Sequence, residues 1–186
     1  MVPDLEQKGF TLVELLVALV VMGILGIGAV RLFVAQHQSF RLQNDGVLAT
    51  QNARAGFDMM TRELRNAGYD PRDTAGSAIT TWTATGFGWT ADLNADGDVA
   101  DDGEAVLWFY QADPGELVRR EGGVDVTVAD GITGLELAYF ADEDGTLATA
   151  PDEIEQVGMA MTYATPEGVP TGRLETQVAV RNNIYE

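Results

Sequence analysis

Residues 8–26 read KGFTLVELLVALVVMGILG, and this stretch decides how the fold begins. From Phe10 to Val30 every residue is uncharged except Glu14. A helix over this run is about 30 Å long, which matches the hydrocarbon core of a bilayer. A carboxylate inside hydrocarbon costs several kcal/mol unless it is paired. A plain membrane anchor therefore does not explain Glu14.

The composition excludes several classes of function. The chain has 29 acidic and 11 basic residues, a formal net charge of −18, and such a surface repels nucleic acid phosphates. It has no cysteine, which excludes disulfides and thiolate metal sites, and one histidine, which excludes a multi-histidine metal site. No nucleophile stands in a pattern with a base. We therefore expect neither an enzyme nor a nucleic-acid-binding protein.

The residues that lead into the apolar run carry a family resemblance. The stretch GFTLVE (residues 9–14) resembles the prepilin signature of type IV pilins and type II secretion pseudopilins. The resemblance implies that prepilin peptidase cleaves after Gly9 and that the new Phe10 amine is methylated. Residues 1–9 would then be the leader peptide, and Glu14 would be the fifth residue of the mature chain.

The same resemblance implies a role for Glu14. In a filament, the packed N-terminal helices exclude water, and Glu14 meets the positively charged Phe10 amine of a neighbouring subunit. This pairing favours the filament over the bilayer and sets the axial register. Subunits at the very tip of such filaments often lack this acid, so its presence implies another subunit above this one.

The apolar run also predicts the first half of one long helix. No proline occurs between Pro3 and Pro71, and Gly68 predicts the helix end near residue 67. We expect residues 10–34 to form the transmembrane or filament-core half and residues 35–68 the amphipathic half. Apolar residues at spacings of three and four predict an amphipathic stripe along the second half. The stripe comprises Phe57, Met60, Leu64 and Ala67, with Phe40, Val47 and Leu48 upstream and Arg54, Glu63 and Arg65 on other faces.

The periodicity changes after residue 75. Seven segments, separated by clusters of Gly, Pro and Asp, have the pattern of strands. They are 79–85, 105–111, 116–120, 124–128, 132–141, 154–164 and 174–182. The predicted fold class is α+β, in which one long N-terminal helix packs on an antiparallel β-sheet domain over residues 69–186. This is the type IV pilin-like fold that the resemblance implies.

The acidic loop DLNADGDVADDGE (residues 92–104) is the one candidate ligand site. Its alternating oxygen-bearing residues before Gly97 match the start of an EF-hand calcium loop. Its closing acid stands one residue late and strand-like residues follow, so it is not a true EF-hand. Because so many carboxylates repel one another without a cation, we expect a structural calcium; the alternative is a solvated acidic turn. The candidate ligands are Asp92, Asn94, Asp96 and Asp98, with Asp101, Asp102 or Glu104 closing the shell.

A second resemblance narrows the expected function. The segment ARAGFDMMTRELRNAGYDP (residues 53–71) resembles the end of the long helix in PilW-type minor pilins, and J-type pseudopilins have a similar segment. We expect a minor pilin that helps to initiate a type IV pilus and sits at or near its tip. The alternatives are a J-type pseudopilin of a type II secretion system and a calcium-dependent adhesive tip protein.

The resemblance also implies partners and a location. The partners are other minor pilins, the major pilin, prepilin peptidase and the inner-membrane assembly platform. Before assembly the chain would cross the inner membrane once, with its globular domain outside the cytoplasm. After assembly it would lie in an extracellular pilus or a periplasmic pseudopilus.

Overall fold

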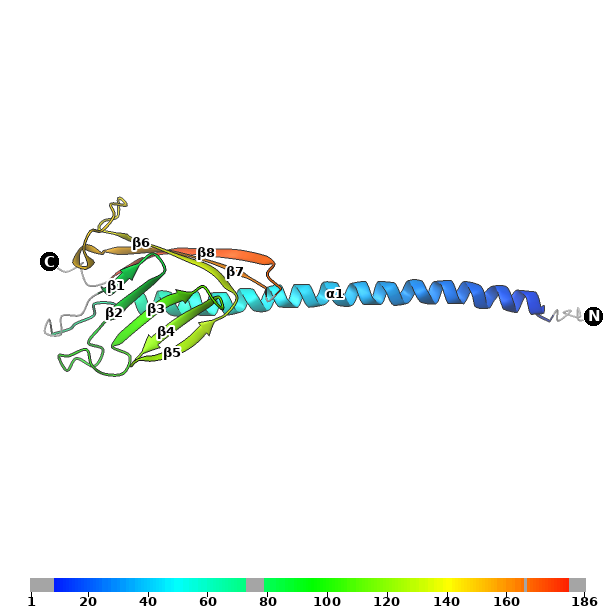
Figure 1. The fold of residues 1–186 in the computed structure, drawn as a ribbon, viewed down its shortest axis with the longest axis horizontal. Helices are drawn as coiled ribbons and strands as arrows, with labels where there is room; N and C mark the ends of the chain where they lie inside the picture. Colours follow the sequence, from blue (N-terminus) through cyan, green and yellow to red (C-terminus); the bar gives the residue numbers. More distant parts are fainter. Residues whose placement is uncertain (1–8, 73–78, 166, 181–186) are drawn as a thin grey trace, which may run out of the picture. The chain divides into compact units, whose positions relative to one another are not determined.

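The computed structural model describes residues 9–72, 79–165 and 167–180 (Figure 1). These residues form one α-helix, eight strands and a short 3₁₀ helix. The chain divides into two compact units, Met1–Asn44 and Asp45–Glu186. The helix α1 (Leu12–Leu64) runs through the described part of the first unit and supplies the first element of the second. The architecture is the predicted α+β class, with a long helix packed against antiparallel strands.

The helix α1 stays regular through the glycines of its apolar half and ends close to the predicted position. It stops at Leu64, three residues before Ala67. Gly68 has a φ of 76°, a left-handed conformation that glycine adopts without a Cβ clash. The Gly68 N–H donates to the Thr90 carbonyl at 2.9 Å. The chain therefore leaves the helix directly against the first sheet.

The first sheet has five antiparallel strands in the order β1-β2-β3-β4-β5. The strands are β1 (Ile79–Thr83), β2 (Gly86–Thr90), β3 (Ala105–Gln111), β4 (Glu116–Glu121) and β5 (Val124–Ala129). The sequence prediction missed β2, because glycines alternate through its sequence GFGWT and indicated a turn. A Cβ at Gly86 would lie 2.7 Å from the Trp108 carbonyl oxygen. Glycine here permits close approach to β3 rather than chain reversal.

The second sheet has three antiparallel strands in the order β6-β7-β8, so the predicted strands are divided between two sheets. The strands are β6 (Ile132–Phe140), β7 (Gln156–Ala164) and β8 (Pro170–Ala179), with the 3₁₀ helix η1 (Pro151–Glu153) before β7. The Tyr139 hydroxyl oxygen lies 2.9 Å from the carbonyl oxygens of both Thr83 and Gly86, and its one O–H, shared between them, joins the sheets. The predicted end of the last strand, residue 182, lies outside the described residues.

The core lies where α1 meets the two sheets. The predicted stripe is confirmed, because all four of its residues from Phe57 to Ala67 are buried. Trp89 and Trp108 are also buried there. The upstream part of the stripe, Phe40, Val47 and Leu48, is exposed and is not part of this core. The first buried residue of α1 is Ala53, and the partly buried Ala49 one turn earlier already packs against the core.

The structure places the Glu63 side chain on a different face of α1 from the predicted one. Its side chain was expected on a face away from the core, but it is only 16% exposed and points at the first sheet. Its carboxylate accepts the Trp108 indole N–H at 2.8 Å and the Arg119 Nε–H at 2.9 Å. Arg119 also donates to Glu121, and that hydrogen bond holds the pKa of the Glu121 carboxyl below its usual range. Glu63 therefore ties α1 to β3 and β4 through polar contacts.

Candidate assembly and cation sites

The start of α1 is closed by a capping box that the sequence pattern Thr-x-x-Glu signals. Thr11 precedes the helix, and the Glu14 carboxylate accepts the Thr11 backbone N–H at 2.9 Å and its hydroxyl at 3.0 Å. The Glu14 N–H donates back to the Thr11 hydroxyl at 3.3 Å. Sequence reasoning singled out Glu14 for its charge and missed this local role. In the isolated chain, Glu14 already has hydrogen-bond partners of its own.

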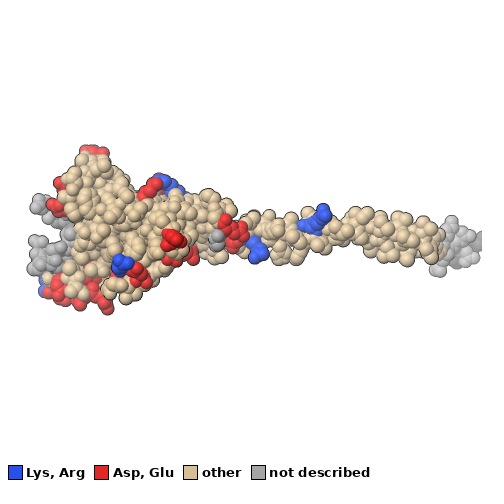
Figure 2. Space-filling view, in the orientation of Figure 1, with Lys and Arg blue, Asp and Glu red and all other residues tan. Residues whose placement is uncertain are grey.

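The residues on both sides of the predicted cleavage point are accessible. Nothing lies within 4 Å of where a Cβ on Gly9 would be, and Phe10 is 89% exposed. From Leu12 to Val34 the apolar side chains of α1 are exposed, and Figure 2 shows long uncharged stretches along the helix. By length and composition, α1 is apolar enough to cross a membrane. This face of the helix requires hydrocarbon or other helices to cover it.

Two of the predicted calcium ligands are buried and serve as anchors of the acidic loop. Asp92 is fully buried, and its carboxylate accepts the backbone N–H groups of Asp96 at 3.1 Å and Gly97 at 3.0 Å. Glu104 is 1% exposed, and its carboxylate accepts the N–H groups of Leu93 at 2.9 Å and Asp101 at 3.3 Å. These bonds give both buried carboxyl groups hydrogen-bond partners inside the protein. They also fold the loop back on itself between β2 and β3.

Other predicted ligands converge on the exposed side of the same loop. One carboxylate oxygen from each of Asp96, Asp98 and Asp101 lies within 4.8 Å of the others. The Asn94 amide donates to Asp96 at 3.1 Å and to Asp101 at 2.6 Å. Asp102 is exposed beside them. The structure thus divides the predicted set into buried anchors and an exposed carboxylate cluster, which we define as Asp96, Asp98 and Asp101.

The pKa values of two members of the exposed carboxylate cluster are shifted in opposite directions. Hydrogen bonds from the Asp98 N–H and the Asn94 amide lower the pKa of Asp96. The Asn94 hydrogen bond also acts to lower the pKa of Asp101, but repulsion from Asp96, with desolvation and the charges of Glu104 and Asp98, outweighs it and raises that pKa. A cation would relieve this repulsion. The donors are hard oxygen atoms of the kind that calcium prefers.

The fold and the N-terminal site together define a class of protein. It has a single long helix with an uncovered apolar half, an accessible Gly9–Phe10 bond and an acid at position 14, and the same helix continues into an α+β domain. Residues 5–30 match the family model described as the prokaryotic N-terminal methylation motif. No curated protein and no solved structure gives a significant match. The motif supports a type IV pilin-like or pseudopilin-like protein that prepilin peptidase processes and that assembles with other pilins.

We predict that a bulky residue at position 9 blocks maturation. Gly9→Leu places a side chain at the residue after which the peptidase cuts, and we expect at least about a tenfold loss of mature chain, equivalent to 1.4 kcal/mol in the transition state. Gly9→Ala should be processed better, because its side chain is a single methyl group. Immunoblots separate precursor from mature chain. Mature Gly9→Leu protein at the wild-type level would refute cleavage at this bond.

Proposed function

We propose that this chain is a minor pilin of the PilW type, which helps to initiate a type IV pilus and lies at or near its tip. The observation that carries the proposal is the uncovered apolar half of α1, which begins at the methylation motif and contains one acid. Such a helix is stable in a bilayer or in the core of a filament built from similar helices. The sheet domain then remains outside the helical core, available to neighbouring subunits.

The preference for a pilus over a secretion pseudopilus rests on the resemblance of residues 53–71 to PilW-type minor pilins. The structure supplies a reason for that segment's composition. Its apolar positions pack against both sheets, and its Glu63 bonds to β3 and β4. The segment therefore contains the part of α1 that packs on the two sheets within the second unit.

The decisive experiment uses a strain that lacks this chain. Surface filaments are sheared off and their pilin content is measured, and secreted protein is assayed in the same culture. Loss of pili with normal secretion is the expected result. Normal pili with blocked secretion would assign the chain to the J-type pseudopilins instead. Normal pili and normal secretion would contradict both roles, and attachment to surfaces would then test the adhesive tip alternative.

We further propose that the exposed carboxylate cluster binds a structural calcium ion. Asp96, Asp98 and Asp101 supply charged oxygens, and backbone carbonyls and water complete the coordination shell. The support is the convergence of the three carboxylates and the repulsion that raises the pKa of Asp101. Because the loop joins β2 to β3, which pack on the core, an ion there would stabilise the whole sheet domain.

This proposal predicts that calcium stabilises the wild-type chain and not a cluster variant. At calcium concentrations about 100 times the Kd, one site contributes about 2.7 kcal/mol, a rise in melting temperature of roughly 5–10 °C for a domain of this size. The double variant Asp96→Ala/Asp101→Ala should melt at one temperature in calcium and in chelator. Glu143→Ala/Asp144→Ala removes two acids from another loop and should keep the calcium effect. A wild-type melting temperature that ignores calcium would exclude the site.

A further inference from the structure

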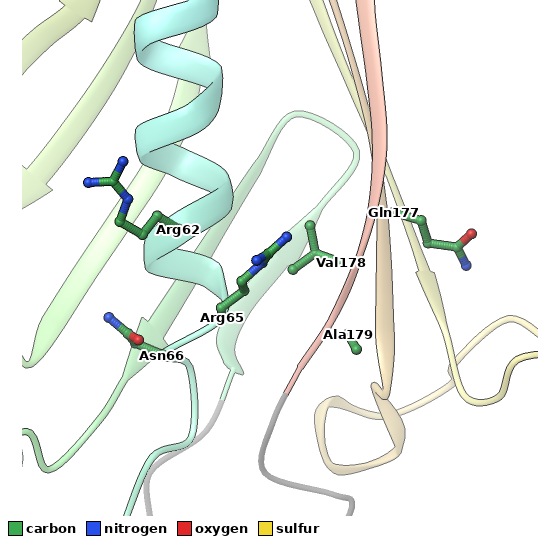
Figure 3. A pocket seen from close by; sticks show the side chains of 6 residues that line it. All are labelled: Arg62, Arg65, Asn66, Gln177, Val178 and Ala179. Carbon is green, nitrogen blue, oxygen red and sulfur yellow. The ribbon is translucent and has the colours of Figure 1, made fainter.

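An arginine-lined recess lies between the end of α1 and strand β8, within the second unit. Its volume is about 510 Å³, and it is open to solvent. Figure 3 shows Arg65 extending toward Val178 on β8, while Arg62, one turn earlier, points to the other side of the helix end. Asn66, Gln177 and Ala179 complete the lining. Arg65 also lines an adjoining recess that contains Arg54.

Among the described residues, the arginines of this recess have no salt-bridge partner, although the chain is strongly acidic. In the described part of the chain, the salt bridges use Arg119, Arg120 and Arg173 only. Arg62 and Arg65 are exposed, and no carboxylate is among the residues that line their recess. The adjoining recess does contain Asp58 and Glu175. The recess is thus a local positive site on a chain with a net charge of −18.

The helix dipole alone does not explain the positions of Arg62 and Arg65. Basic residues at a helix C-terminus interact favourably with the helix dipole, and Arg62 lies in the last turn of α1. That effect places a positive charge at the helix end, but it does not require a recess on a neighbouring strand. Arg65 lies beyond the helix end and reaches into that recess. The Arg65 guanidinium beside this concave surface, with Arg62 on the neighbouring side of the helix end, matches a carboxylate-bearing segment.

The chain itself presents such a segment on another part of its surface. The acidic loop carries the exposed side chains of Asp96, Asp98, Asp101 and Asp102. This loop connects β2 and β3 of the five-stranded sheet, whereas the recess lies against β8 of the three-stranded sheet. The two surfaces are different patches of one domain. A contact between the loop of one copy and the recess of another is heterologous, because it uses two different surfaces. Such a contact can repeat along an assembly.

We propose that the acidic loop of one copy of this chain docks into the arginine-lined recess of a second copy. Arg65 is the central contact, and Arg62 flanks it. Charges separated by more than about 8 Å are screened at physiological salt, so this local attraction acts despite the net negative charge of both copies. The inference deepens the proposed role as a filament subunit, since it gives the sheet domain a defined neighbour. The contact itself can be measured without filaments.

The absence of cysteine permits a direct test by disulfide cross-linking. The full chain is purified in detergent micelles with a calcium chelator, as two single-cysteine variants: Asn66→Cys in the recess and Ala100→Cys in the loop. A disulfide forms only where two Cα atoms come within about 7 Å. Mixing the variants with the oxidant diamide should give a cross-linked dimer. Thr133→Cys, exposed on β6, replaces Ala100→Cys as the control for random collisions.

Charge reversal then tests the chemistry of the contact. Arg62→Glu/Arg65→Glu on the recess copy should lower cross-linking by about tenfold or more. Asp98→Lys/Asp102→Lys on the loop copy should do the same, and the two reversed copies mixed together should recover the yield. Arg41→Glu reverses one such charge elsewhere on α1 and should have no effect. Far-ultraviolet circular dichroism checks that each variant is folded.

Two results would overturn the inference. One is a cross-linking yield that equals the Thr133→Cys control. The other is a yield that falls in each reversed variant but does not recover when the two are mixed. Either result leaves the filament role intact if the deletion strain still lacks pili. Conversely, the expected cross-link with normal pili in the deletion strain would refute the filament role alone.

Discussion

Replacing Glu14 by alanine is expected to leave cleavage after Gly9 intact but to lower recovery of the chain in sheared filaments by at least about tenfold, a free-energy difference of 1.4 kcal/mol. The physical reason is that α1 exposes an apolar face in which Glu14 is the single charge before Arg31. In hydrocarbon or in a packed helical core, that charge requires a cationic partner. We propose that the Phe10 amine freed by cleavage is this partner.

The capping box makes a matched control possible. Glu14→Gln keeps a side chain that can accept the Thr11 N–H, because glutamine also serves in capping boxes, but it removes the charge. Glu14→Ala removes both. If pairing with the amine drives assembly, both variants should fail to incorporate while being processed normally. Wild-type incorporation of Glu14→Gln would assign the effect of alanine to lost capping and would refute the pairing.

Replacing Glu63 by alanine is expected to destabilise the sheet domain by about 2–3 kcal/mol. The change leaves the Arg119 guanidinium and the Trp108 indole N–H without their acceptor, and Trp108 is fully buried. Removing one partner of a fully buried ion pair costs about 3–5 kcal/mol. The side chains of Glu63 and Arg119 are each 16% exposed, so solvent recovers part of that loss.

The measurement is thermal unfolding of the full chain in micelles, followed by near-ultraviolet circular dichroism. The expected loss corresponds to a fall of about 5–10 °C in melting temperature. Asp58→Ala, which removes an exposed acid from the same helix, should shift it by less than about 2 °C. In a double-mutant cycle, Glu63→Ala and Arg119→Ala should be strongly non-additive. Additive effects would show that the two side chains do not act as a pair.

Local signals in the sequence were sufficient for the long helix and most strands. The apolar run, the stripe from Phe57 to Ala67 and the stop at Gly68 each depend on neighbours a few residues away. The capping box could also have been predicted, since Thr11 and Glu14 have the required spacing. The prediction for Glu14 considered only its charge and a partner subunit. Strand β2 could not be predicted from the sequence. Its glycines are explained by the close approach of β3, which is a tertiary contact.

In the acidic loop too, the sequence predicted which residues come together but not which of them are buried. Its composition predicted convergent oxygen ligands, and Asp96, Asp98 and Asp101 do converge. Which carboxylates face solvent could not be deduced, because Asp92 and Glu104 are buried by the packing of the flanking strands and bind backbone N–H groups. The calcium ion remains a proposal that the melting experiment tests.

The order of residues alone therefore determined the membrane-length helix, its N-terminal motif, its stop and the α+β class, since each follows from covalent spacing and local periodicity. Tertiary structure alone decided that the strands form two sheets, that Glu63 bonds to Trp108 and Arg119, and that Arg65 lines a recess against β8. The Glu63 bonds and the recess join residues more than 40 positions apart in the chain, as the separation of 45 between Glu63 and Trp108 illustrates. Contacts at such separations depend on how whole elements pack, and no local pattern encodes them.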